Sequence, residues 1–288
     1  MKNQKSNKIV LVATQEKLRD LCIQSEIPEA VHSLADRNPL WGGMDKYLAM
    51  GGKYAYKKYR ETDVEKLSTD EMLNLISNNL ELGYKIHLVH PDNVDSELNL
   101  GTKLLAGNGV IYFEHPLYNG MYLLPSKYSS TMCSEKESTF LRLAGALGAK
   151  RIQLESIQTS DKNSVFGGKF SAKEVAGELG FSANFDKTGS VVKSIYKEFH
   201  KPLFSSPVIP KDLAEWVQYD SDLRTMAADR IEANAKMSKV RLEFSENTTF
   251  GVNIAGKMAA RGFSVGGKTR TLTRSIWSFE VEYYDMSA

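Results

Sequence analysis

The chain has 288 residues, of which 42% are hydrophobic, 25% charged and 10% aromatic, values close to those of ordinary soluble proteins. This composition excludes collagen-like, disulfide-scaffolded and extensively disordered chains, and the length allows one large domain or two of moderate size. Lysine and arginine number 37 against 35 acidic residues, so the formal charge of +2 identifies no partner and only a local imbalance of charge can do so.

Targeting signals are weak throughout the chain. The two cysteines, Cys22 and Cys133, are far apart in helix-like stretches and do not indicate a disulfide framework. The N-terminal apolar run, residues 9–13, is too short for a signal peptide, and no window reaches about 18 consecutive apolar residues. We therefore expect a cytoplasmic protein without a transmembrane helix, whose contact with any membrane is peripheral.

The first elements in the chain have clear start signals. Residues 8–13 (KIVLVA) predict a buried strand, and Thr14 stands where the N-cap of the following helix is expected. Ser68 and Glu71 have the spacing of a capping box ahead of an apolar helical run. Between these elements, helical patterns cover residues 28–37 and 45–60.

Two strands and a helix complete the first part of the chain. Residues 84–91 and 109–116 predict strands that each end in His-Pro. A second capping-box pattern, Ser134 with Glu137, predicts the start of a helix, and Gly148 suits its C-terminal end.

From residue 150 onwards the sequence repeats itself. KRIQLES and the later GELGFSANFDK of the first copy match KVRLEFS and AARGFSVGGK of the second. Each copy predicts a strand, a short helix and a long alternating segment, at the scale of one supersecondary unit. We place the copies at about residues 150–200 and 238–285, joined by a Pro-rich link (201–210) and an amphipathic helix (212–236).

The predicted fold class is α+β. We expect a mixed α/β region over residues 1–148 and a duplicated β-α-β region over residues 149–288. The duplicated region is expected to form a largely antiparallel sheet.

The alternating segment of the second copy is long and amphipathic. From Phe263 to Tyr283, apolar residues and threonines occupy one face and charged or polar residues the other, with period two. This length exceeds that of ordinary strands, so the segment is either two strands with a turn near Gly266 and Gly267 or one long bent strand.

The same part of the chain carries a local excess of positive charge. No acidic residue occurs from Asn247 to Phe279. The basic residues in this interval are Lys257, Arg261, Lys268, Arg270 and Arg274. We predict that they bind an anionic partner, either lipid or another anionic molecule.

Two pairs of polar residues are candidates for an enzyme or metal site. His90 with Asp92, and Glu114 with His115, end two predicted strands, and their convergence at one sheet edge would suit acid-base chemistry or a metal. Without a tight ligand spacing, we assign no catalytic or metal-ligating residue and no cofactor.

Two motif-like stretches are also read as structural. Residues 262–269 (GFSVGGKT) match the phosphate-loop pattern, but a helical pattern precedes them and an alternating segment follows, the reverse of a phosphate loop. Residues 53–60 (KYAYKKYR) could contact nucleic acid, but a helix with inward tyrosines and solvated lysines explains them equally well. Nucleic acid is therefore not an expected partner.

In its organisation, the region of residues 149–288 resembles the paired-hairpin pore formers of the gasdermin and perforin type. The resemblance is one of arrangement, and it assigns no catalytic or binding residue. It implies a membrane-acting protein that self-assembles into a homo-oligomer and inserts two amphipathic β-hairpins. Two alternatives remain: a soluble, non-enzymatic binding or assembly module for an anionic partner, and an enzyme with a site around His90 and His115.

Overall fold

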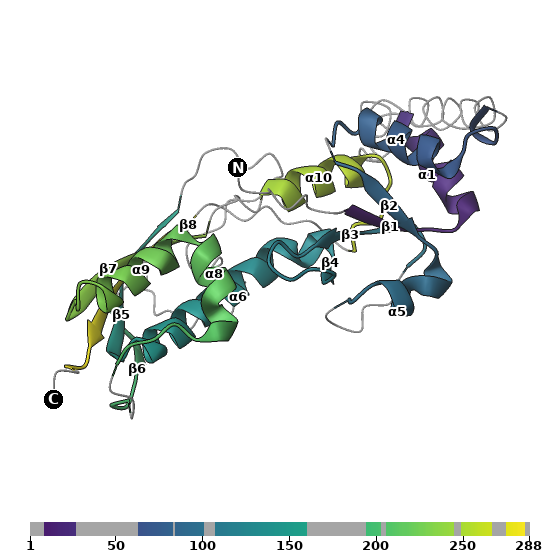
Figure 1. The fold of residues 1–288 in the computed structure, drawn as a ribbon. Coiled ribbons are helices and arrows are strands. Elements are labelled where there is room, and N and C mark those ends of the chain that lie inside the picture. The colour runs from purple at the N-terminus through teal and green to yellow at the C-terminus, as the bar shows by residue number, and fades with distance from the viewer. Residues whose placement is uncertain are drawn as a thin grey trace. The chain divides into compact units, whose positions relative to one another are not determined.

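The chain forms two compact units, which Figure 1 shows with their element labels. The first contains Met1–Tyr128 and Thr249–Thr269, and the second contains Ser129–Thr248 and Arg270–Ala288. The computed structural model describes residues 9–26, 63–82, 84–100, 107–159, 194–202, 206–244, 249–266 and 275–285. The helices predicted at residues 28–37 and 45–60 lie outside these ranges.

The first unit contains a mixed four-stranded sheet. Its strands are β1 (Ile9–Val12), β2 (Ile86–Val89), β3 (Val110–Glu114) and β4 (Tyr122–Leu123), in the order β2-β1-β3-β4. Strand β1 is parallel to β2 and antiparallel to β3, and β3 is antiparallel to β4. All four residues of β1 are buried, because side chains cover both faces of this central strand.

The helices of the first unit are α1 (Gln15–Glu26), α4 (Thr69–Asn79), the 3-10 helix η1 (Pro91–Asn93), α5 (Val94–Glu97) and α10 (Thr249–Ala260). Two of them, α1 and α4, begin where the capping signals at Thr14 and Ser68 predict. The Thr14 hydroxyl accepts the backbone N–H of Lys17 at 3.3 Å. Ser68 and Glu71 form both hydrogen bonds of the predicted capping box, which satisfies N–H groups that a helix start otherwise leaves unpaired.

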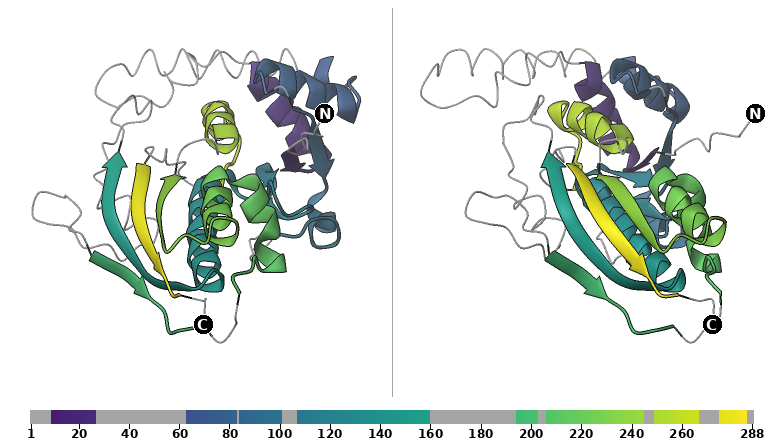
Figure 2. Two further views of the ribbon diagram at one scale, coloured as in Figure 1. Left: turned by 60° about the vertical axis from the view of Figure 1, so that its left-hand side comes forward. Right: turned by 90° about the vertical axis from the view of Figure 1, so that its left-hand side faces the viewer.

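The second unit contains a fully antiparallel four-stranded sheet. Its strands are β5 (Ala149–Thr159), β6 (Ser194–Glu198), β7 (Met237–Phe244) and β8 (Ser275–Tyr283), in the order β6-β5-β8-β7. Figure 2 shows these strands side by side with helices on one face. Together with the first sheet and its helices, this arrangement confirms the predicted α+β class.

Helices cover one face of this second sheet. They are α6 (Pro125–Ala146), of which all but the first turn belongs to this unit, the 3-10 helix η2 (Lys211–Leu213), α8 (Ala214–Tyr219) and α9 (Ser221–Ile231). Trp277, Phe279 and Val281 of β8 are buried on the covered face, and the Phe279 ring lies 4.9 Å from that of Phe140 on α6. The alternation of apolar and polar residues therefore separates a packed face from a more exposed one.

Two predicted helix boundaries in this unit are wrong. Ser134 and Glu137 do not start a helix, because α6 begins at Pro125 and both residues lie within it. The single helix predicted over residues 212–236 is interrupted at Asp220, whose carboxylate accepts two N–H groups and starts α9 as its N-cap. The predicted stop at Gly148 is confirmed, since α6 ends at Ala146 and Gly148 has a φ of 82°.

The strand order brings the strands of each predicted copy together. Strand β5 lies beside β6, and β7 lies beside β8. The helix and most of the alternating segment predicted for the first copy fall within residues 160–193, outside the described residues, and the end of that segment is β6. The duplication and the predicted division of the chain at residue 148 therefore stay predictions.

Candidate functional site

The residues considered for an enzyme site do not converge. Strand β1 lies between β2 and β3, so the two His-Pro strand ends are not neighbours. Val12 of β1 is opposite both Val89 of β2 and Val110 of β3. His90 therefore follows β2 at the end of the sheet where β3 begins, whereas Glu114 and His115 lie at the opposite end, where β3 finishes.

These polar side chains hold local backbone turns instead. His90 Nδ1 accepts the N–H of Asp92 at 3.4 Å and caps η1. Buried His115 accepts the N–H groups of Leu117 and Tyr118 through Nδ1, at 3.1 and 3.2 Å. The Glu114 carboxylate accepts a further backbone N–H, from Gly120, at 3.0 Å.

A metal site has no support within the described ranges, where no group of three or more His, Cys, Asp or Glu residues could hold an ion. Cys22 and Cys133 are both buried and form no disulfide. Burial raises the pKa of the Cys133 thiol to about 12, so this side chain stays protonated and unreactive near neutral pH.

The phosphate-loop pattern lacks the structural context of a phosphate loop. Helix α10 precedes it, where a phosphate loop has a strand. Within the described residues 262–266, the N–H of Phe263 donates to the Met258 carbonyl at 3.0 Å and that of Ser264 to Gly109 at 3.3 Å. These N–H groups are thus occupied by protein carbonyls rather than directed toward a common anion site.

Two of the predicted basic residues contact groups of the first unit. Lys257 Nζ lies 3.3 Å from Glu81 Oε2, and the Arg261 guanidinium donates to the backbone carbonyl of Ser25. Lys268, Arg270 and Arg274 lie outside the described residues. The tyrosine-rich and lysine-rich stretch of residues 53–60 lies outside them as well.

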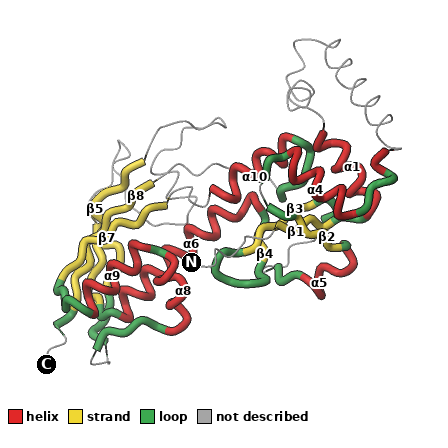
Figure 3. The backbone as a smooth tube through the Cα atoms, turned by 45° about the horizontal axis from the view of Figure 1, so that its top comes forward, coloured by secondary structure: helices red, strands yellow, loops and turns green. Residues whose placement is uncertain are grey.

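Two long connections leave and re-enter the second sheet at the same end. Thr159, the last residue of β5, is opposite Ser275, the first residue of β8, and Ser275 is also opposite Phe244, the last residue of β7. Strand β6 enters from this side too, because it is antiparallel to β5 and begins opposite Leu154. Residues 160–193 join β5 to β6, and residues 245–274 join β7 to β8. Figure 3 shows β5, β8 and β7 side by side in the sheet from which they depart.

The second connection is partly folded into the first unit. Residues 249–269 belong to that unit, although β7 and β8 on either side belong to the other. Among the side chains of the connection that the structure describes, the buried apolar ones are Ile254, Met258, Phe263 and Val265. Ser126 fixes its last described turn, since the Ser126 N–H donates to Val265 O at 3.2 Å and its hydroxyl to Gly266 O at 3.1 Å.

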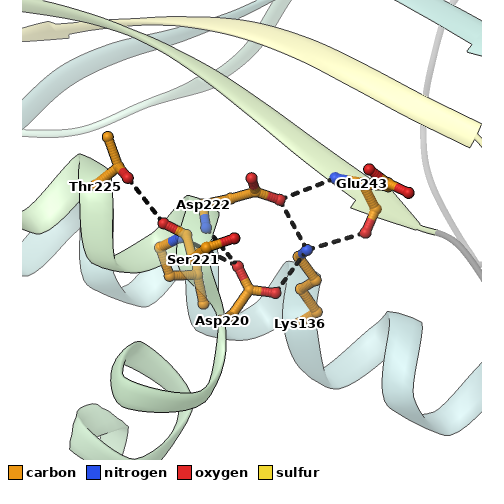
Figure 4. A network of polar contacts seen from close by, with 7 residues as sticks. Lys136, Asp220, Ser221, Asp222, Thr225 and Glu243 are labelled. Carbon is orange, nitrogen blue, oxygen red and sulfur yellow. Dashed lines mark hydrogen bonds and ion pairs between the residues drawn. The ribbon is translucent and has the colours of Figure 1, made fainter. Parts of the chain in front are cut away.

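A buried lysine holds the end of β7 from which this connection leaves (Figure 4). Lys136 Nζ lies 2.6 Å from Asp220 Oδ2 and 3.1 Å from Asp222 Oδ2, and it donates to the Glu243 carbonyl at 2.9 Å. Asp222 Oδ2 also accepts the N–H of Glu243 at 3.1 Å. We call Lys136, Asp220 and Asp222 the lysine cluster, and it connects α6, the start of α9 and β7.

Sequence reasoning did not identify the lysine cluster. Lys136 stands within a helix next to Glu135 and Glu137, a pattern that predicts a solvated face. A signal was present at Asp220, because Asp followed by Ser-Asp-Leu at a break in a helical pattern indicates an N-cap.

No helix within the described residues is long and apolar enough to cross a membrane. No protein-family model, curated protein or solved structure matches the chain.

Proposed function

We propose that this protein is a membrane-acting, self-assembling protein that converts residues 160–193 and 245–274 into two amphipathic β-hairpins. The observation that supports the proposal is the departure of both connections from one end of a single antiparallel sheet. Hairpins formed there would extend strand pairs β5-β6 and β7-β8 in line with the hydrogen-bonded ladder that already exists.

Both connections have the length that such a conversion requires. A strand crosses the hydrocarbon core with about 9–11 residues, so a hairpin needs about 20 residues and a turn. Residues 160–193 and 245–274 each exceed this requirement. If they extend as strands, their backbone N–H and C=O groups would also pair within the sheet. This pairing is necessary in a bilayer, because the hydrocarbon core contains no water to bond them.

The charge of the second connection favours an anionic membrane surface. Residues 247–279 contain five basic residues and no acidic residue. Each basic residue near an anionic surface contributes about 1 kcal/mol of attraction. We propose a cytoplasmic protein that reaches such a surface peripherally before insertion, with no cofactor.

Leakage of an entrapped dye from vesicles tests this proposal. At micromolar protein, we expect leakage from vesicles that contain phosphatidylserine and much less from vesicles of phosphatidylcholine alone. Reversal of two charges in the connection, Arg270→Glu with Arg274→Glu, is expected to reduce leakage. The matched control reverses two exposed lysines of the second unit outside the connections, Lys201→Glu with Lys211→Glu.

The absence of both leakage and lipid co-sedimentation would refute the membrane proposal. Co-sedimentation without leakage would instead support the alternative function, a non-enzymatic module that binds an anionic partner. In that case the basic residues of the connection would bind without any conversion to hairpins.

A further inference from the structure

Strands β6 and β7 form the two edges of the described four-stranded sheet. An edge strand presents backbone N–H and C=O groups that can pair with a strand of another chain, and folded proteins protect such edges. The outward-facing backbone groups of β6 and β7 therefore determine whether this sheet can grow.

The outward-facing groups of β7 follow from its register. Tyr283 N–H donates to the Lys236 carbonyl at 3.0 Å, and the register of β7 with β8 continues without a bulge from Met237 to Phe244. Backbone groups alternate in direction along a strand, so even-numbered residues face β8 and odd-numbered residues face away. Glu243 is odd-numbered, so both of its backbone groups point away from β8.

The lysine cluster occupies both of these outward groups. Asp222 accepts the Glu243 N–H at 3.1 Å, and Lys136 donates to the Glu243 carbonyl at 2.9 Å. An incoming strand would need the same two groups for its own ladder. While the cluster is intact, side chains take the place of a neighbouring strand at this position.

We propose that the lysine cluster blocks the β7 edge and that, once released, this edge pairs with the β6 edge of a second copy of the chain. The inference rests on the proposed self-assembly and names its interface. Neighbouring strands of the sheet alternate in direction, so a β6 strand placed beside β7 in the same orientation continues the antiparallel pattern. Such a head-to-tail contact uses two different surfaces, and it closes into a ring only where the rotation from one copy to the next completes a full turn.

The first test measures mass in lipid-free solution by light scattering after gel filtration. Asp222→Ala removes the acceptor of the Glu243 N–H but leaves Asp220 to pair with Lys136, and Lys136→Met removes the lysine itself. Both variants are expected to at least double the mass relative to wild type. Arg142→Met is the matched control, because Arg142 also lies on α6 and pairs with an aspartate, Asp212, away from β7.

A second substitution tests whether the β7 edge carries the association. Glu243→Pro removes the outward N–H without removing a hydrogen bond to β8, so the proline is tolerated at an edge strand. The double variant Asp222→Ala with Glu243→Pro is expected to return to the mass of the single chain. Circular dichroism and thermal unfolding are used to verify that each variant is folded.

Crosslinking identifies the partner edge. Chains with Lys239→Cys on β7 are mixed with chains with Lys197→Cys on β6, both in the Asp222→Ala background, and treated with a bis-maleimide reagent. Both positions are exposed, whereas the native cysteines are buried. We expect a crosslinked dimer in the mixture, and less in either chain alone.

Folded Asp222→Ala and Lys136→Met variants that keep the mass of wild type would overturn the inference. So would association that survives Glu243→Pro, or a mixture that crosslinks no better than its parts. None of these measurements includes lipid, so wild-type failure to release dye refutes the membrane function separately from the interface.

Discussion

Val110 of β3 and Ser264, just after α10, lie opposite each other in a parallel β-bridge. The Ile111 N–H donates to Ser264 O at 3.1 Å, and the Ser264 N–H donates to Gly109 O at 3.3 Å. Strand β4 pairs only with Phe113 and Glu114 among the described residues, so the bridge occupies a part of β3 that β4 does not reach. This contact anchors the second connection to the first unit.

A disulfide across this bridge is expected to block membrane insertion. Neighbouring strands lie about 4.8 Å apart, within the Cα separation that a disulfide spans. In the variant Val110→Cys with Ser264→Cys, oxidation prevents residues 249–269 from leaving the first unit. Dye leakage from anionic vesicles should fall to the level without protein and recover when dithiothreitol is added.

The single variants Val110→Cys and Ser264→Cys serve as controls, and their leakage should not respond to oxidant. Equal leakage from the oxidised and reduced double variant, with the disulfide verified by mass spectrometry, would show that the connection does not need to be released.

Gly266→Ala is expected to loosen the same segment without a crosslink. Gly266 has a φ of +79°, and a Cβ placed there would lie 2.6 Å from Leu124 Cδ2. The backbone strain and the clash together cost about 1–3 kcal/mol. Amides of residues 254–266 should exchange hydrogen faster, and dye release should begin sooner.

Gly120→Ala is the matched control for this substitution. Gly120 has a similar φ of +75°, but a Cβ there meets nothing within 4 Å. It should share the backbone cost without affecting the connection. Faster exchange at residues 254–266 in both variants would point to general destabilisation rather than to release of the segment.

Signals formed by residues close together in the sequence predicted two helix boundaries correctly. The capping box of Ser68 and Glu71 and the stop at Gly148 use residues within one turn, so their chemistry is readable from the sequence. Ser134 and Glu137 show the limit of this reasoning. Any Ser and Glu three apart within a long helix match the pattern, and only the upstream start at Pro125 tells the cases apart.

Features that depend on strand order could not be predicted in the same way. The position of β1 between β2 and β3 separates His90 from His115, and nothing local specifies that order. Lys136 likewise meets Asp222 and Glu243 only because α6, α9 and β7 pack together. The alternation of the second connection, in contrast, was visible in the sequence, but its shared exit with residues 160–193 required the register of the sheet.

Glu137 is expected to make stability decrease as pH rises. Burial raises the pKa of its carboxyl above the usual 4.5, although a hydrogen bond from Tyr196 and the charge of Lys197 oppose this shift. The folded state therefore holds the proton more tightly than the unfolded state. The resulting stability is present below the unfolded pKa and is lost as pH rises through the folded pKa.

Glu137→Gln removes this titration while keeping a polar group at the site. From about pH 4 to about pH 7, the unfolding free energy of wild type should fall relative to that of the variant in urea denaturation. Glu282→Gln should give the opposite slope, because hydrogen bonds and charge from Lys150 and Arg151 lower the pKa of Glu282. A constant difference between wild type and Glu137→Gln across this range would contradict the assignment.

Arg230 is a buried cation that donates hydrogen bonds to the Asn234 side chain and to backbone carbonyls of three separate segments. Its Nε donates to Leu147 O at 3.2 Å, after the end of α6, and its Nη2 donates to Tyr284 O at 2.8 Å, after β8. Its Nη1 donates to Ala235 O at 2.8 Å, in the turn before β7. The guanidinium also lies over the Tyr283 ring, 4.9 Å from its centroid.

Arg230→Lys is expected to reduce the unfolding free energy by about 2–4 kcal/mol, because an ammonium group cannot reach three divergent carbonyls and leaves some of them unpaired and buried. Arg224→Lys is the matched control on the same helix, since Arg224 is exposed and should change stability by less than about 0.5 kcal/mol. Chemical denaturation with an unchanged m-value measures both effects. Equal effects of the two substitutions would show that the three carbonyl contacts of Arg230 add no stability beyond that of a surface arginine.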